Sequence, residues 1–417
     1  MPKTFFKPRF LSSQGRLQRG LGSAVLAIAL TLGLAPRTLA QALPPAVRFP
    51  FLADPLQDNP LDPLLPRPLV SRPPSPLELY ALDQSLDQLA LEAETLAQAG
   101  DLAEARIIWR REIRLRRLLG VERELAAIDR VGQWLRDRTA TQDLQLYAVR
   151  LDEIRADLVL PADQALLERM ANTYVVLGAI DAAADIRRDL AEAARLATNG
   201  TEYRRQLEIL AALRADWFQF AEAAAAYSEL VALNPADLNP EAERRYLSLQ
   251  AENLEQAQDP AGAIALQQRL LRLYQEDESL WPQIPPLQHR VAQNYLALND
   301  VANAARQLQV AYTNAIDQEQ VEVAANAIND LAAIYKTLGR WTDVGYLYEQ
   351  LLVVQRQAHS AYGMMAAYDE LGQVHEQLGA TSSALAAYRE GLVLARVLGT
   401  RQAYFEAQIA RLTEEAT

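Results

Sequence analysis

Small residues recur along this chain at a nearly constant interval of about 40 positions. One row of them has successive separations of 39, 39, 40, 40, 41, 40 and 40 residues: Ala93, Gly132, Ala171, Ala211, Ala251, Ala292, Ala332 and Gly372. A second row, less uniform in size, follows twelve residues later: Ala105, Leu144, Ala183, Ala223, Ala263, Ala304, Val344 and Ala384. A fixed period of about 20–50 residues is typical of solenoids, in which each repeat buries its apolar face only against its neighbours.

Each interval contains two stretches with helical apolar periodicity, separated by a turn signal. The turn signals are short and rich in Gly, Asn, Asp or Pro: Gly100-Asp101, Leu177-Gly178, Asp259-Pro260, Asn299-Asp300, Leu338-Gly339-Arg340 and Leu378-Gly379. Eight helix–turn–helix units fill residues 77–400, and residues 401–413 are predicted to form a helix that caps the last apolar face. The sequence therefore predicts an all-α solenoid over residues 77–417.

The composition excludes several classes of function. A formal net charge of −12 argues against a nucleic-acid surface as the main face. The absence of cysteine excludes disulfides, thiolate metal sites and a catalytic cysteine. Only three histidines occur, and the chain holds no Gly-rich phosphate loop and no H-E-x-x-H pair. We therefore expect neither catalysis nor a cofactor.

Residues 1–40 resemble an export signal. A basic segment that includes Lys3, Arg16 and Arg19 precedes an apolar run over residues 23–35, and Ala40 supplies a small residue before a cleavage point. The apolar run is shorter than the roughly 20 residues that span a bilayer, so no stable membrane insertion is expected after cleavage. The prediction is an exported protein, periplasmic or thylakoid-lumenal; the alternative is an uncleaved anchor.

Residues 41–76 hold eleven prolines and are predicted to be an extended arm rather than a helix. Phe51 and several leucines give this arm more apolar side chains than a plain spacer needs. Two interpretations remain open at this point. The arm is either a flexible spacer, or a segment that packs along the solenoid or binds a partner.

Two units share the same order of residue types: a large–small pair, a position for an aromatic ring, a turn glycine, a second small position and a second aromatic. In the first unit these are Leu331-Ala332, Tyr335, Gly339, Val344 and Tyr348. In the second they are Leu371-Gly372, His375, Gly379, Ala384 and Tyr388. In this pattern the chain resembles the tetratricopeptide repeat (TPR) family over about three-quarters of its length. The resemblance implies a right-handed superhelical solenoid. The family period is about 34 residues, so the longer period here predicts longer helices. The second unit, with Leu144 at a small position, fits least well.

In TPR arrays the first helix of each unit lines the concave surface, and the resemblance implies a groove there. The residues that it assigns to partner binding are mostly polar: Asp129, Glu168, Asn172, Glu208, Arg245, Glu252, His289, Gln293, Asn326, Asn329, Lys336 and Asp369. Asparagine side chains donate and accept hydrogen bonds, which suits capture of an extended peptide. The acidic bias favours a basic or neutral partner segment.

The expected function is that of an exported scaffold or assembly factor that binds a protein segment in this groove. An alternative rests on the organisation of the chain, which is similar to that of exported TPR factors of cyanobacterial photosystem II assembly. That resemblance implies divalent-metal binding, with manganese as the candidate ion and Asp129, Glu168, Glu208 and Glu252 as candidate oxygen ligands. The oligomeric state is left open.

Overall fold

The computed structural model describes residues 43–57, 61–65, 72–138, 140–233 and 239–415. The chain divides into two compact units, residues 1–50 and 51–417. Of the first unit only residues 43–50 are described, so the predicted export signal lies outside the described residues. No helix in the described ranges is long and apolar enough to cross a membrane.

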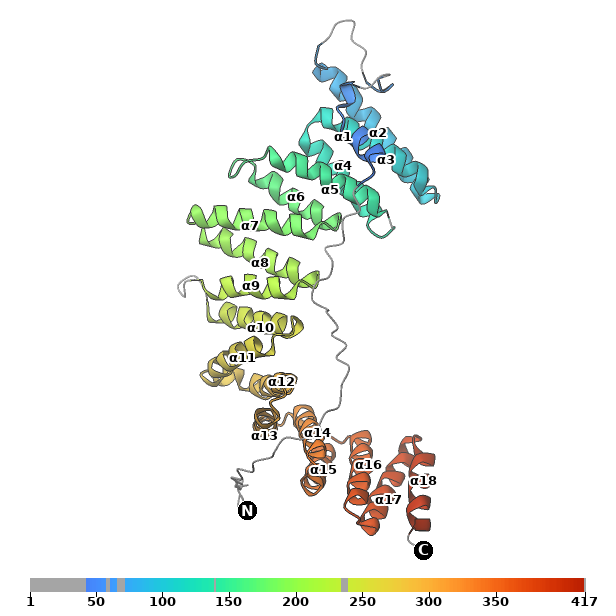
Figure 1. Ribbon diagram of the computed structural model, residues 1–417, viewed down its shortest axis with the longest axis vertical. Coiled ribbons are helices and arrows are strands. Elements are labelled where there is room, and N and C mark those ends of the chain that lie inside the picture. The colour runs from blue at the N-terminus through green and yellow to red at the C-terminus, as the bar shows by residue number, and fades with distance from the viewer. Residues whose placement is uncertain (1–42, 58–60, 66–71, 139, 234–238, 416–417) are drawn as a thin grey trace, which may run out of the picture. The chain divides into compact units, whose positions relative to one another are not determined.

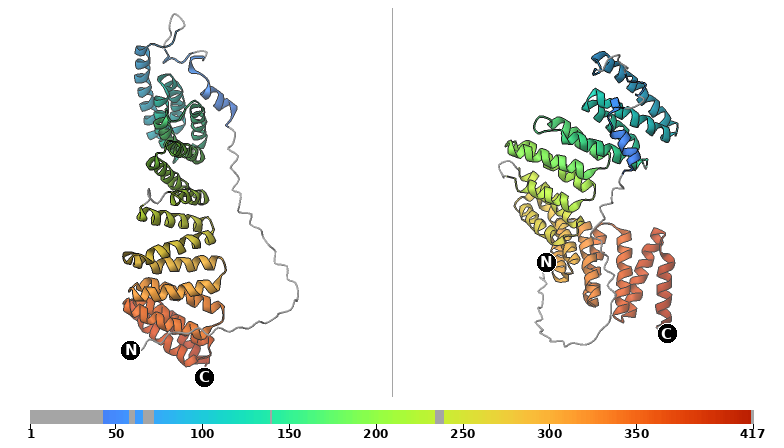
Figure 2. Two further views of the ribbon diagram at one scale, coloured as in Figure 1. Left: turned by 90° about the vertical axis from the view of Figure 1, so that its left-hand side faces the viewer. Right: turned by 45° about the horizontal axis from the view of Figure 1, so that its top comes forward.

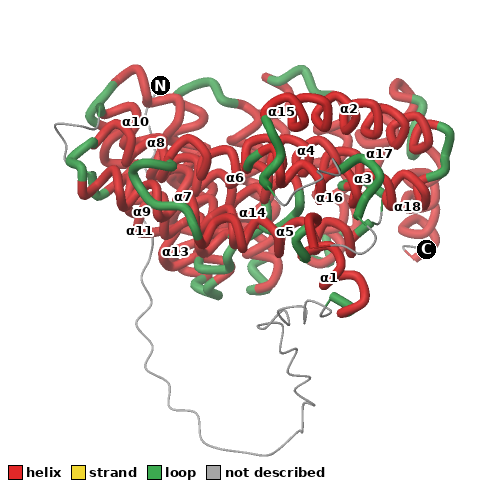
Figure 3. The backbone as a smooth tube through the Cα atoms, turned by 90° about the horizontal axis from the view of Figure 1, so that it is seen from above, coloured by secondary structure: helices red, strands yellow, loops and turns green. Residues whose placement is uncertain are grey.

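The second unit is built from helices that pack on their sequence neighbours, and no strand occurs in the part of the chain that the structure describes (Figures 1 and 3). The first helix of each repeat, called helix A, is α2 (Pro76–Gln98), α4 (Val121–Leu135), α6 (Gln164–Val176), α8 (Gly200–Asp216), α10 (Pro240–Gln256), α12 (Ile284–Ala297), α14 (Val321–Thr337) or α16 (Ala361–Gln377). The second, called helix B, is α3 (Leu102–Arg116), α5 (Thr141–Ala156), α7 (Ile180–Leu196), α9 (Phe220–Val231), α11 (Pro260–Gln275), α13 (Val301–Asp317), α15 (Trp341–Gln357) or α17 (Thr381–Leu398). Helix α18 (Gln402–Glu415) follows the last pair, and short 3-10 helices are η1 (Pro55–Gln57), η2 (Arg117–Leu119) and η3 (Glu278–Gln283).

The two rows of small residues lie where the helices cross. Ala211 and Ala223 are fully buried, as are Ala332 and Val344 three repeats later along the chain. Helices α13 to α16 each contain 17 residues, as the long period predicts. The fold-class prediction, a helical solenoid of paired helices with a terminal capping helix, is confirmed. In Figure 2 the helix pairs follow one another along the second unit.

The cap joins the last repeat through apolar and polar contacts. Phe405 of α18 is fully buried, and its ring centroid lies 6.4 Å from that of Tyr388 on α17. Arg401 and the hydroxyl of Tyr404 donate hydrogen bonds of 2.6 and 2.7 Å to the carboxylate of Asp369 on α16. The cap therefore satisfies polar groups of the last repeat as well as covering its apolar side.

The second repeat departs from the others, as its sequence suggests. Leu144 is only half-buried, α5 makes few contacts with α4 and α6, and α4 packs directly on α6. Charged groups add to the apolar side chains that α5 buries, because the fully buried Asp143 accepts hydrogen bonds from Arg106 and Arg110 of α3. Buried ion pairs replace the contact between small residues that the neighbouring repeats use.

The prediction that residues 41–76 cannot form a helix is wrong for one stretch. Residues Pro45–Leu52 form α1, with Pro45 at its first position and Pro50 inside it. Proline fits the first helical turn because the N–H groups of that turn have no partner within the helix. The amides of Val47 and Arg48 both donate to the carbonyl of Pro44, which begins this turn.

Residues 51–65, called the strap, pack on the first helices of the second unit over their described parts, 51–57 and 61–65. The strap side chains Phe51, Pro55 and Leu65 are buried. Asp62 forms a bidentate ion pair with Arg111 of α3, and both N···O distances are 2.7 Å. Of the two interpretations left open by the sequence, packing along the solenoid applies to this segment.

Acid should loosen the strap. The hydrogen bonds from Arg111 lower the pKa of Asp62 below its ordinary value of 3.8. A depressed pKa means that the pair stabilises the bound strap fully above that pH, and that this stabilisation is lost as pH falls below it. Hydrogen exchange of residues 61–65 should therefore be faster in Asp62→Asn than in the parent at pH 7. The difference should shrink as pH falls toward and below the lowered pKa of Asp62, and a difference that stays constant as pH falls would contradict this role of the carboxylate.

Candidate partner-binding face

The predicted groove residues differ widely in exposure. Five are exposed: Asn172, Arg245, Gln293, Asn326 and Asn329. Six are half-buried: Asp129, Glu168, Glu208, Glu252, His289 and Lys336. Asp369 is buried. The surface that these positions share on successive A helices is called the helix A face.

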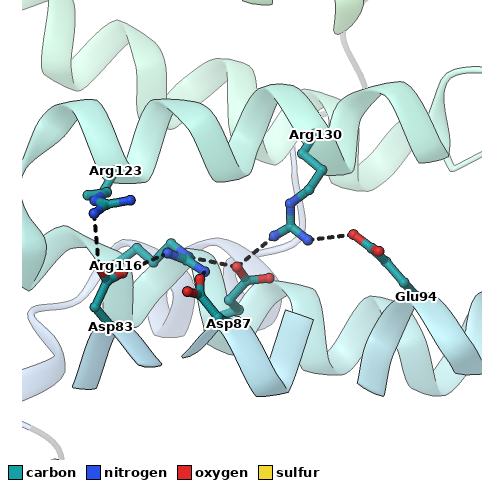
Figure 4. Close-up of polar contacts among 7 residues, drawn as sticks. Asp83, Asp87, Glu94, Arg116, Arg123 and Arg130 are labelled. Atoms are coloured by element: carbon teal, nitrogen blue, oxygen red, sulfur yellow. Dashed lines mark hydrogen bonds and ion pairs between the residues drawn. The ribbon is translucent and has the colours of Figure 1, made fainter. Parts of the chain in front are cut away.

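Charged groups on this face are joined from one A helix to the next. The first of these links is drawn in Figure 4, where Arg130 of α4 bonds to Glu94 of α2 at 2.7 Å. Further links pair a carboxylate with an arginine about one repeat later: Glu168–Arg205 at 2.9 Å, Glu208–Arg245 at 3.4 Å and Glu252–Arg290 at 3.1 Å. In the C-terminal repeats the acid comes second: His289–Asp330 at 2.8 Å, and Lys336–Glu370.

These links change what the acidic bias of the sequence implies about the charge of a partner. The carboxylates of Glu168, Glu208 and Glu252 already accept hydrogen bonds from arginine, so their charges are largely compensated within the chain. Glu208 also accepts from the phenol of Tyr246, and burial with this hydrogen bond raises the pKa of that phenol to about 12. The repeat-to-repeat spacing of 37 residues between acid and arginine was the sequence signal for these pairs.

Asp369 is not available to a partner in this structure. It was predicted to line the groove because its position in α16 matches that of Glu208 in α8. Both of its carboxylate oxygens instead accept hydrogen bonds from Arg401 and Tyr404, which follow the last repeat. The neighbour of α16 on this side is the capping helix, so the same motif position has a different environment.

The uncharged part of the helix A face lies on α12, α14 and α16. Six exposed amide or alanine side chains form what we call the amide strip: Gln293, Asn326, Asn329, Ala333, Ala366 and Gln373. Gln293, Asn326 and Asn329 were predicted to lie on this surface, and Ala366 was not. Amide side chains can both donate to and accept from a peptide backbone, and the alanines leave room for a backbone to approach.

A hollow of about 460 Å³ lies beside the Glu252–Arg290 pair. Its walls come from α8, α9, α10 and α12, and they include Phe220 and Leu249. These two residues were not predicted, because in the sequence they read as ordinary members of a core. The hollow combines an apolar wall with an internally paired acid and base.

The candidate metal ligands are not gathered. Among the described residues, no group of three or more histidine, aspartate or glutamate side chains could hold a metal ion. Glu168, Glu208 and Glu252 lie on three different A helices, and each accepts a hydrogen bond from a different arginine. The metal alternative therefore has no supporting cluster in the described ranges.

No protein-family model and no curated protein matches the sequence. Among solved structures, BtubC (BKLC) from P. vanneervenii is similar at 18% identity, over 53% of this chain and 92% of that chain, with a TM-score of 0.37. The nearly identical TPR-like repeats of a Podosopora anserina kinesin light chain show 19% identity over 46% and 95%, with a TM-score of 0.36. Aspartyl phosphate phosphatase F from Bacillus subtilis shows 12% identity over 84% and 80%, with a TM-score of 0.37.

Likeness at these levels supports no statement about activity or partner. The chain's own geometry decides the fold: paired helices repeat about every 40 residues and bury a small residue on each helix. The chain has a TPR-type repeat fold. Within this TPR array, the helix A face carries two kinds of group: ionisable side chains paired between A helices along the array, and the exposed amide strip of α12, α14 and α16.

Proposed function

We propose that this TPR array is an exported scaffold or assembly factor that binds an extended segment of a partner protein on its helix A face, without catalysis. The observation that carries the proposal is the amide strip, because it is exposed and uncharged on three successive A helices. Export rests on the sequence of residues 1–40 alone.

The chemistry of the strip favours an uncharged partner segment. An extended peptide exposes N–H and C=O groups at regular intervals, and amide side chains bond both kinds. Since the carboxylates of Glu168, Glu208 and Glu252 are paired with arginine, they add little attraction for a basic segment. The sequence left a basic or neutral partner open, and of these the internal pairing supports a neutral one.

The strip should control peptide affinity. Fifteen-residue peptides can be selected from a random displayed library on the full chain, and their affinity measured by fluorescence anisotropy. Asn326→Ala with Asn329→Ala should weaken binding about tenfold or more, because two hydrogen bonds are worth roughly 1–3 kcal/mol. Both side chains are exposed, so the free energy of unfolding should not change.

Gln357→Ala is the matched control, because Gln357 is an exposed amide at the end of helix B α15. Its replacement should leave affinity unchanged. Equal binding by the parent and the double variant would mean that the selected peptides sit elsewhere. A library that yields no binder would speak against peptide capture as such.

A further inference from the structure

The strap is held by a regular row of arginines on the outer side of α3 and η2. Arg111 binds the carboxylate of Asp62, Arg114 donates to the carbonyls of Ala53 and Asp54, and Arg117 donates to the carbonyl of Leu52. The three arginines are spaced three residues apart, which places them along one side of a helical segment. The strap runs antiparallel to them.

An aromatic side chain anchors the other end of the strap. The ring of Phe51 is almost fully buried, with its centroid 5.7 Å from that of Tyr147 and 4.8 Å from the guanidinium carbon of Arg117. Backbone carbonyls, one carboxylate and one aromatic ring thus make the contacts. Of these contacts, those of the ring and the carboxylate depend on the identity of a strap side chain, and the buried side chains of Pro55 and Leu65 add apolar burial.

The side chains that contact Phe51 carry hydrogen-bonding groups that the strap does not use. Nη2 of Arg117 and the hydroxyl of Tyr147 are buried, and neither has a hydrogen-bond partner among the described residues. Both belong to the side chains that contact the Phe51 ring. Buried polar groups are normally hydrogen-bonded. Two unpaired groups around one side chain therefore indicate a site that could also hydrogen-bond a ligand with more polar groups than the strap has.

The charge of α3 also differs from that of the chain as a whole. Residues Leu102–Arg116 include five arginines in a chain with a net charge of −12. Three of them pair with carboxylates of the helices, and the other two, Arg111 and Arg114, contact the strap. A basic surface of this kind attracts acidic segments, and the strap sequence carries three aspartates and no basic residue between Phe51 and Leu65. The surface and the strap are complementary in charge.

We propose that the outer surface of α3, η2 and α5 is a second peptide-binding site, separate from the helix A face, and that the strap occupies it as an internal ligand. The partner that it fits is an acidic segment with an aromatic residue followed eleven positions later by an aspartate, as in Phe51 and Asp62. Such a segment from another protein binds by displacing the strap.

The test uses a labelled synthetic peptide that copies residues 51–65 and the full-length chain, with fluorescence anisotropy as the readout. Phe51→Ala with Asp62→Lys removes both anchors of the internal strap and leaves α3 and α5 unchanged. This variant should bind the peptide about tenfold or more tightly than the parent, because the internal competitor is weakened. Asp62→Lys alone, which keeps Phe51 in its seat, is used if the double variant does not fold.

Substitutions that reverse the charges of the arginine and of the peptide aspartate then locate the site. Arg111→Glu, added to the strap-weakened variant, should lower affinity about tenfold or more, and a peptide carrying Asp62→Lys should recover it. Arg389→Glu, at an exposed arginine on α17, is the matched control and should leave binding unchanged. The proposal is overturned if the folded, strap-weakened variant does not bind the peptide, or if Arg111→Glu has no effect on binding.

Discussion

Gly372→Ala should destabilise the last repeat and its cap, although alanine is the better helix former. A Cβ atom at Gly372 would lie 2.5 Å from Cζ of Tyr388, well inside contact distance. Tyr388 cannot move away easily, because its ring is buried and its hydroxyl donates a 2.5 Å hydrogen bond to Glu376. Overpacking costs typically about 1–3 kcal/mol, which we expect to exceed the gain of roughly 1 kcal/mol in helix propensity.

The effect should be local, because each repeat contacts only its neighbours. Hydrogen exchange should speed up in α16, α17 and α18, since Tyr388 also packs on Phe405 of the cap. Gly345→Ala is the control: a Cβ there would meet Cγ1 of Val374 at 3.4 Å, an ordinary contact. Combining Gly372→Ala with Tyr388→Ala should remove the clash. Additive costs for those two changes would show that the ring is not the obstacle.

The rows of small residues were sufficient to predict the fold because their requirement is local and repeated. Ala211 or Ala332 must be small wherever two helices cross closely, whatever lies further away. The helix A face depends instead on pairs of residues. In the sequence Glu168 has no evident partner, whereas in the structure it accepts a hydrogen bond from Arg205, 37 residues later.

The environment of a predicted site residue also depends on which repeat of the array contains it. Asp369 has the same motif position as Glu208, but Tyr404 comes from the capping helix and Arg401 directly precedes that helix, which breaks the repeat. The strap has no periodic pattern at all, and its prolines predict only local backbone preference. Its packing depends on Phe51 and Asp62 meeting residues of α3, η2 and α5, which no spacing rule relates to them.

The irregular second repeat should be the most sensitive to loss of charge pairing. Replacing both Arg106 and Arg110 by alanine leaves the fully buried carboxylate of Asp143 without its two donors. An uncompensated buried charge costs about 3–5 kcal/mol. Asp143→Ala should cost less, because both arginine side chains are about a quarter to a third exposed and can turn to water. Hydrogen exchange of α5 measures the difference locally.

The triple variant Arg106→Ala, Arg110→Ala, Asp143→Ala separates charge from packing. It should recover most of the stability that the double arginine variant loses, because the unpaired carboxylate is gone. If it instead remains as unstable as the double variant, the arginine stems hold α5 by apolar contact and their charge is incidental. Recovery would show that the double variant is unstable because of its unpaired buried carboxylate, and that the buried apolar side chains of α5 hold this helix in the array once that charge is removed.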